Sequence, residues 1–190
     1  VMINASDFIM EPLKQKLLVD KTFLSKKKSP IKLVRIACHF DEINKIQNIV
    51  KILNYKGYEV AINMMQISEQ RNEEILKILE VIKKMKIKTL YFADSLGSLN
   101  PRDTEKIINT LKKKWKGNIG IHTHDNIGKA LENSIKAIKN GVNWVDTTVT
   151  GMGRGPGNTK TEIAIMEFKK FQKKKINKIQ LLNLINKYFK

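Results

Sequence analysis

The sequence predicts an α/β fold in which helices wrap a parallel sheet, and two patterns support this prediction. Short apolar runs of strand length recur along the chain, and their starts are 24 to 31 residues apart, the length of one βα unit. Amphipathic stretches with helical periodicity fill the intervals between them. The expected strands are 1–4, 32–38, 58–63, 88–93, 118–123 and 142–148, and the expected helices are 44–55, 70–85, 101–115 and 129–140.

Six such units can form either a doubly wound open sheet or part of a TIM (β/α)8 barrel, and the polar residues favour the barrel. An open sheet gathers its ligand groups at one switch point, whereas a barrel collects them from many strand ends around one mouth. In this chain polar residues end or follow nearly every expected strand: His39, Asn63, Asp94, Ser95, His122, His124, Asp146 and Thr148.

The length predicts that this barrel is incomplete. A full barrel takes roughly 250 residues, and 190 residues hold about six βα units, so the first two units are expected to be missing. The predicted organisation is a partial barrel and catalytic domain over 1–167 and a C-terminal helical extension over 168–190, made of one or two amphipathic helices. The start at Val1 suggests an internal residue of a longer protein. The strands 1–4 and 142–148 would leave open edges, so a fused or partner domain or a homo-oligomer is expected to complete the sheet.

The composition is strongly basic, but its details do not indicate a nucleic-acid partner. The formal charge is +18, from 36 Lys plus Arg against 18 Asp plus Glu, which ordinarily suggests nucleic acid or an anionic membrane. Only four of these residues are Arg, so 36 − 4 = 32 are Lys, the less suited residue for bidentate recognition. The lysines are spread along the chain, as on solvated helix faces. An inactive or basic nucleic-acid-binding module stays open as an alternative.

Membrane association is not expected, because no apolar run approaches the ~20 residues that span a bilayer. The single cysteine, Cys38, has no internal disulfide partner. It is consistent with a reducing compartment, and we expect a cytoplasmic protein.

The sharpest local signal is the pair His122 and His124 at the end of an expected strand. Side chains two apart on a strand share a face, with backbones about 7 Å apart, so both imidazoles could close on one metal ion. Imidazoles suit Mn²⁺, Co²⁺, Fe²⁺ or Zn²⁺. The alternative is that both histidines merely cap the strand through hydrogen bonds.

A glycine-dense turn follows the last expected strand, from Thr150 to Asn158. It would bring backbone amides and the Asn158 side chain over the barrel mouth. Its spacing is not that of a nucleotide-binding P-loop, and Arg154 could pair with a carboxylate or a phosphate. The turn could also be only a flexible connection. On the expected strand 32–38, Arg35 shares a face with His39 and could either pair with an acidic residue or contact substrate.

Residues 121–162, with their His-Thr-His-Asp-Asn and Gly-Met-Gly-Arg-Gly-Pro-Gly-Asn motifs, resemble the HMG-CoA lyase-like (DRE-TIM) metallolyase superfamily. Within it they are closest to the 4-hydroxy-2-oxovalerate aldolase-like enzymes. Weaker matches upstream are Asp-Ser-Leu-Gly at 94–97 and Val-Arg-Ile-Ala-Cys-His at 34–39. In order and spacing the matches cover almost the whole chain.

The resemblance implies a metal site and a set of catalytic candidates. His122 and His124 would bind a divalent metal (Mn²⁺, Mg²⁺, Co²⁺ or Zn²⁺), and Asn158 would lie near or on it. His39, Asp94 and Ser95 would line the pocket, and Arg154 joins them as a catalytic candidate.

The implied function is a metal-dependent aldolase or lyase that makes or breaks a carbon–carbon bond next to a 2-oxo acid such as pyruvate. The metal would stabilise the enolate, and the substrates would be a small 2-oxo acid and an aldehyde. The alternative is a Claisen-condensing acyl-CoA synthase of the isopropylmalate or homocitrate synthase type. Those synthases carry Gly-x-Gly-Glu-Arg where this chain has Gly-Met-Gly-Arg at 151–154, which favours the aldolase. Family members also have an Arg-Asp pair on a first strand, and its Asp is a third ligand. No counterpart is found here, so these 190 residues are expected to bind metal poorly and to turn over little.

Overall fold

A computed structural model describes residues 1–168 and 177–189, and its centre is one parallel sheet. Six strands pair in the order in which they occur in the sequence, as expected of consecutive βα units. They are β1 (Met2–Asn4), β2 (Leu33–Cys38), β3 (Glu59–Met64), β4 (Thr89–Asp94), β5 (Asn118–Thr123) and β6 (Trp144–Val145).

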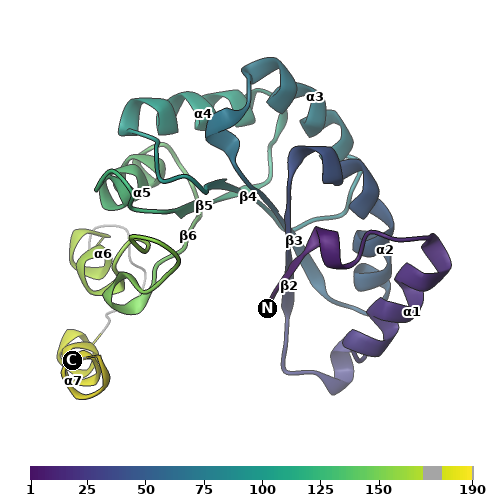
Figure 1. Cartoon of the computed structure of the whole chain (residues 1–190), viewed down its shortest axis with the longest axis horizontal. Helices are drawn as coiled ribbons and strands as arrows, with labels where there is room; N and C mark the ends of the chain where they lie inside the picture. The colour runs from purple at the N-terminus through teal and green to yellow at the C-terminus, as the bar shows by residue number, and fades with distance from the viewer. Residues whose placement is uncertain (169–176, 190) are drawn as a thin grey trace.

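The helices follow an arc around the outside of this sheet (Figure 1). Within the described residues the sheet does not close, because β1 and β6 are its two edges. The predicted incomplete barrel is therefore confirmed. The α-helices are α1 (Pro12–Thr22), α2 (Gln47–Tyr55), α3 (Asn72–Ile82), α4 (Pro101–Lys114), α5 (Ala130–Lys139), α6 (Thr161–Glu167) and α7 (Lys178–Tyr188). Short 3-10 turns are η1 (Ala5–Asp7), η2 (Lys26–Lys28), η3 (Phe40–Ile46), η4 (Ile67–Glu69) and η5 (Val149–Gly151).

The two faces of the sheet have different chemistry, because side chains alternate along each strand. The outer face is aliphatic and aromatic, and its side chains are completely buried beneath the helices; examples are Ile36, Ile62, Phe92 and Ile121. The inner face carries the residues between them, which are small or polar; examples are Arg35, Ala61, Tyr91, Gly120 and His122. The outer face therefore supplies the core, and the inner face is free to hold a site.

The predicted strands agree with the structure except at the last one. Residues 142–148 were expected to be a strand, but only Trp144 and Val145 pair with β5. Beyond them the chain leaves the sheet to meet the glycine turn, since the Thr148 amide donates to the Thr159 carbonyl. Within the described residues β6 has a neighbour on one side only, and the chain turns away from the sheet soon after Val145. These two features explain why β6 is short.

Helix α1 was not predicted, because its apolar residues do not follow a helical stripe. Leu13 and Leu17 are more than 60% exposed, whereas the buried positions are Gln15 and Val19. Gln15 is satisfied by donating to the Phe8 carbonyl at 3.0 Å. The helix starts at a proline, and the Glu11 side chain caps it by accepting from two backbone amides.

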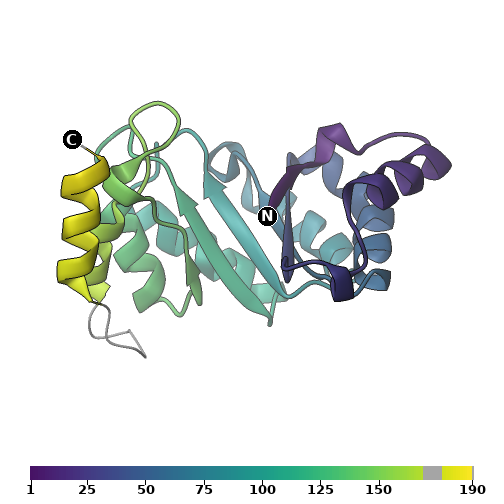
Figure 2. The ribbon, with the colours of Figure 1, turned by 90° about the horizontal axis from the view of Figure 1, so that it is seen from below.

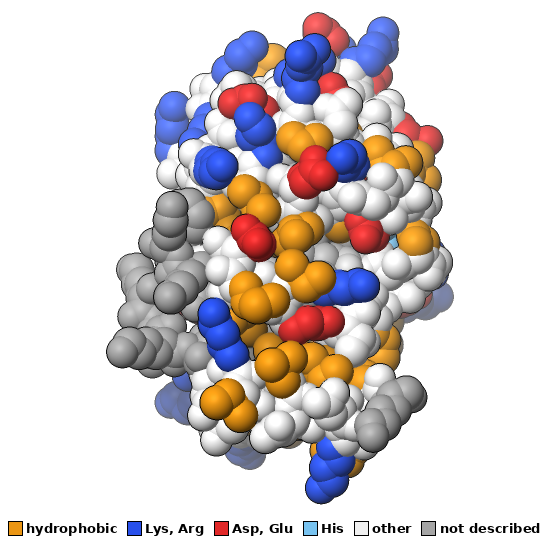
Figure 3. All heavy atoms as spheres, turned by 90° about the vertical axis from the view of Figure 1, so that its left-hand side faces the viewer, with side chains coloured by type: hydrophobic (Ala, Val, Ile, Leu, Met, Phe, Trp, Pro, Cys, Tyr) orange, Lys and Arg blue, Asp and Glu red, His pale blue; other side chains and the backbone are white. Residues whose placement is uncertain are grey.

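The C-terminal segment includes α7, which lies at the opposite end of the molecule from α1 (Figure 2). The expected extension over 168–190 includes this helix, and its residues 169–176 and 190 lie outside the described part of the chain. Apolar side chains gather on this side of the molecule (Figure 3), and the exposed ones on α6 and α7 include Met166, Ile179, Leu182 and Leu184. None of the helices within 1–168 and 177–189 is long and apolar enough to cross a bilayer.

The outer-face core predicts a clear difference between two leucines in helices. Leu79 of α3 is fully buried and Leu17 of α1 is 61% exposed. We expect Leu79→Ala to lower the free energy of unfolding by about 2–5 kcal/mol, because it removes buried surface and leaves a cavity. The control Leu17→Ala should change it by less than about 0.5 kcal/mol. Urea unfolding measures both, and equal midpoints would contradict this account of the core.

Candidate active site

The structure brings the rings of His122 and His124 together where β5 ends. Their centroids are 5.2 Å apart and their planes are inclined at 78°. Both side chains are half-buried. Burial lowers the pKa of His124, and the nearby charges of His122 and Arg154 lower it further. His124 is therefore neutral at neutral pH, the state in which an imidazole can coordinate a metal.

A carboxylate that follows β6 holds the His122 ring at its Nδ1 atom. Asp146 Oδ2 lies 2.9 Å from His122 Nδ1 and 2.7 Å from Arg35 Nη1. Burial alone would raise the pKa of Asp146, but the hydrogen bond from His122 and the charge of Arg35 outweigh it and hold the pKa below its ordinary value. The question left open for Arg35 is thus answered, because its guanidinium pairs with an acidic residue.

Tyr91 of β4 supports Arg35 from the inner face of the sheet. The guanidinium carbon of Arg35 lies 4.4 Å from the centre of the Tyr91 ring, within the range of a cation–π contact. Gly120 makes room for that ring, since a Cβ at this position would lie 2.3 Å from ring atoms of Tyr91. Burial, followed by the charge of Asp146, raises the pKa of Tyr91 to about 12, so the phenol stays protonated.

The glycine turn folds back onto the end of β5. The Asn158 side-chain amide donates to the Thr123 carbonyl at 2.7 Å, and the same nitrogen is 3.4 Å from His122 Nε2. Gly157 makes the close approach possible: its φ is +90°, and a Cβ there would lie 2.0 Å from the Gly151 carbonyl oxygen. Asn158 is therefore placed beside the histidine pair, with its amide nitrogen rather than its oxygen toward His122.

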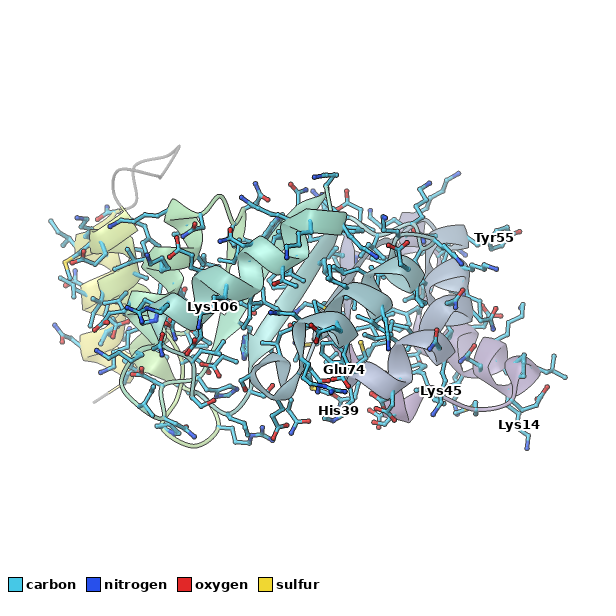
Figure 4. The ribbon with its side chains drawn as sticks, turned by 90° about the horizontal axis from the view of Figure 1, so that it is seen from above. Lys14, His39, Lys45, Tyr55, Glu74 and Lys106 are labelled. Atoms are coloured by element: carbon cyan, nitrogen blue, oxygen red, sulfur yellow. The ribbon has the colours of Figure 1, made fainter. Side chains whose placement is uncertain are left out.

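Three of the four catalytic candidates line one pocket of about 350 Å³ at the strand ends, namely His39, Ser95 and Arg154. Among the described residues that line it, Arg154 is the one arginine or lysine, and none is an Asp or Glu. His39 lies at the edge of the molecule opposite the one that Tyr55 occupies at the end of α2 (Figure 4). The pocket suits a small anion. The remaining lining residues are Asn4, Ser6, Met65, Gln66 and Leu96.

The fourth candidate, Asp94, lies at the end of β4 and is fully buried. Its two carboxylate oxygens accept hydrogen bonds from the backbone amides of Ser98 and Leu99, at 3.0 and 3.1 Å. Burial raises the pKa of Asp94, although these two hydrogen bonds act in the opposite direction. Asp94 is not among the pocket-lining residues, and its contacts close the turn after β4.

Sequence reasoning did not single out two residues of this region. Asp146 was noted as a strand end but was not linked to His122 or Arg35, although an acid directly after the last strand, β6, was a usable signal. Gln66 lines the pocket in a left-handed conformation, with φ of +53°, which is uncommon for a residue other than glycine. The backbone amide of Gln66 donates to Ser95 Oγ at 3.0 Å, and the sequence carries no signal for this contact.

Comparison with known proteins identifies the family of this chain. The HMGL-like family model matches residues 29–186, most of the chain. The chain belongs to the HMGL-like family. It is 31% identical over 134 residues to a 4-hydroxy-2-oxovalerate aldolase of Carboxydothermus hydrogenoformans, covering 70% of this chain and 40% of that protein. It is 30% identical over 140 residues to a protein of the same name from Pelotomaculum thermopropionicum, covering 74% of this chain and 41% of that protein. The aligned part thus spans about two fifths of these relatives.

Solved structures show the same fold. The N-terminal domain of a candidate aldolase from Bacteroides vulgatus superposes with a TM-score of 0.80 at 29% identity, covering 98% of this chain and 62% of that one. The HMG-CoA lyase of Bacillus subtilis superposes with a TM-score of 0.74 at 18% identity, covering 84% of this chain and 62% of that one. These likenesses support the barrel architecture of this HMGL-like chain, with fewer strands than a closed barrel.

The position of Asp94 predicts that its replacement destabilises the fold. In Asp94→Asn one of the two backbone amides loses its acceptor, and a buried unsatisfied donor costs about 1–3 kcal/mol. We expect a lower urea midpoint with an unchanged slope. Asp41→Asn, the same change at an exposed carboxylate in η3, is the control and should shift the midpoint little. If both variants unfold together with the unsubstituted protein, the turn does not depend on Asp94.

Proposed function

We propose that this chain carries the catalytic site of a divalent-metal-dependent aldolase or lyase that acts on a carbon–carbon bond next to a 2-oxo acid. The supporting observation is the half-buried pair His122 and His124 at the end of β5. Neither lines the pocket, but its residue Arg154 interacts with His124. The family and the names of the relatives point to the same chemistry. The reaction proposed is that of a 4-hydroxy-2-oxovalerate aldolase: cleavage of a 4-hydroxy-2-oxo acid into pyruvate and an aldehyde, or its reverse.

The two imidazoles fit part of a metal site. His122 uses Nδ1 toward Asp146, which leaves the lone pair of Nε2 for a cation, and the lowered pKa of His124 keeps that ring neutral. Among residues 1–168 and 177–189 no group of three or more His, Cys, Asp or Glu side chains is arranged to hold a metal ion. Asn158 lies next to the histidine pair. In this proposal the other coordination positions of the metal are taken by water, by substrate oxygens and by a further carboxylate that these residues do not supply.

A bound Mn²⁺, Mg²⁺, Co²⁺ or Zn²⁺ would supply Lewis-acid chemistry at the 2-oxo group. The protein residues have separate tasks. Arg154 binds the substrate carboxylate in a charge-assisted pair. Ser95 Oγ accepts a hydrogen bond from the backbone amide of Gln66. Its own hydroxyl proton therefore stays available to be donated to a substrate oxygen. His39 lines the pocket from the end of β2. It takes the proton of the 4-hydroxyl as the carbon–carbon bond breaks and then gives it to the carbon that becomes the methyl group of pyruvate.

The histidine pair gives the test of this proposal. We expect His122→Ala and His124→Ala each to abolish Mn²⁺-dependent release of pyruvate from 4-hydroxy-2-oxopentanoate, measured on the protein as the cell makes it by a coupled pyruvate assay. Chelation with EDTA should have the same effect, and Mn²⁺ should reverse it. Lys45→Ala, at an exposed position outside the pocket, is the control. Either histidine variant with full activity would refute the site, and an unsubstituted protein inactive with all four metals would refute the function.

Arg154 predicts an effect on substrate binding rather than on turnover. Loss of a hydrogen bond to a charged group costs about 1.5–3 kcal/mol, so Arg154→Gln should raise KM for the 2-oxo acid roughly 10- to 100-fold, with a smaller change in kcat. Arg71→Gln is the matched control, because this arginine is 79% exposed before α3, lies outside the pocket lining and pairs with Glu74. Steady-state kinetics on both variants measures the difference. An unchanged KM in Arg154→Gln would leave the carboxylate without its proposed partner.

A further inference from the structure

Asp146 makes two contacts that neither the family match nor the names of the relatives account for. One oxygen of its carboxylate serves both the His122 ring and the Arg35 guanidinium, at 2.9 and 2.7 Å. The three side chains come from β5, from the end of β6 and from β2, on the inner face of the sheet. We propose that Asp146 is a positioning residue that fixes the orientation and tautomer of His122, and that Arg35 in turn holds Asp146 in place. The inference rests on the proposed metal site, whose ligand it prepares.

The backbone already sets Asp146 next to His122. In the β5–β6 pair Gly120 is opposite Trp144 and Ile121 is opposite Val145, and the Asp146 amide donates to the Ile121 carbonyl at 3.0 Å. His122 and Asp146 are the next residues after these two pairs. His122 and Asp146 therefore lie side by side with their side chains on the inner face, and the contact needs no long or flexible side chain to form.

The carboxylate selects one of the two neutral forms of the imidazole. An ionised carboxylate can only accept hydrogen bonds, so the ring nitrogen that faces it must carry the proton. That nitrogen is Nδ1, and the lone pair is then on Nε2, on the side of His124 and the glycine turn. Without the carboxylate an imidazole exchanges between two tautomers and rotates more freely, so only part of the population presents Nε2 to a cation.

Arg35 is fixed well enough to hold the carboxylate. Its side chain is only 18% exposed, and that of Asp146 is 24% exposed, so solvent screens the pair less than it would at the surface. Tyr91 packs against the guanidinium at 4.4 Å, and the absence of a side chain at Gly120 leaves space for the Tyr91 ring. The pairing also compensates the Arg35 charge, which would otherwise repel a cation bound at His122.

The test is the isosteric variant Asp146→Asn, with Mn²⁺ as the probe. Replacing a carboxylate that orients a metal-binding histidine typically costs about 10- to 100-fold in metal affinity, and we expect a rise of this size in the Kd for Mn²⁺ measured by calorimetry. Nitrogen-15 NMR of His122 in the metal-free protein gives an independent readout. The unsubstituted protein should show a protonated Nδ1 and an unprotonated Nε2, and the variant should show a mixture of tautomers.

Two further variants separate positioning from a general loss of structure. Asp146→Glu keeps an acceptor and should retain the tautomer with part of the affinity, whereas Arg35→Gln should weaken Mn²⁺ binding even where Asp146→Asn fails to fold. Asp103→Asn is the control and should change neither readout. A tautomer unaltered in Asp146→Asn, or a Kd within twofold of the unsubstituted protein in Asp146→Asn and Arg35→Gln, would overturn the inference. If the unsubstituted protein does not bind Mn²⁺, the proposed function fails by itself, and the NMR signature still decides the role of Asp146.

Discussion

The division of the sheet into an aliphatic outer face and a polar inner face is the constraint on which the rest of this structure depends. Alternation along parallel strands puts Ile36, Phe92 and Ile121 beneath the helices, where they are completely buried. The same alternation forces the residues between them to the inner face. Because the core is provided by one face alone, the other can carry charged and small residues that would be costly inside a packed core.

The inner face tolerates charge because each charged group has a partner there. Arg35 and His122 both face the carboxylate of Asp146, and Tyr91 offers its ring to the guanidinium. An arginine that is only 18% exposed would be unfavourable without a partner for its charge. With its partners, Arg35 holds the side chains of Asp146, His122 and Tyr91 in fixed positions relative to one another. By contrast, most basic residues of the chain are lysines, and the contacts of this network within the described residues involve none of them.

The sequence was sufficient to predict the features that repeat along the chain and insufficient to predict contacts between residues far apart in it. Strand periodicity predicted β2 to β5 within about two residues, and the i, i+2 spacing predicted that His122 and His124 would be neighbours. Helix α1 escaped prediction because its buried positions include Gln15, whose burial depends on a carbonyl it meets only in the folded chain. The pair Arg35 and Asp146 joins strands that are far apart in the sequence, and no local pattern connects them. The resemblance named Asp94 as a pocket residue, but its two hydrogen bonds to backbone amides form only in the folded turn and leave no local pattern in the sequence.

The glycine turn is held against the end of β5 mainly by its backbone. Backbone groups at the end of β5 need partners when no ligand is present, and the Asn158 amide provides one for the Thr123 carbonyl. Asp125 and Gly157 add a second link, because the Asp125 amide donates to the Gly157 carbonyl at 3.0 Å. These bonds anchor the turn through its backbone and one side chain. At His122, Nδ1 is held by Asp146, and Nε2 is left with a weaker contact, the 3.4 Å approach of Asn158. In the proposed metal site a cation at Nε2 would therefore compete with one long hydrogen bond and not with the bonds that hold the turn.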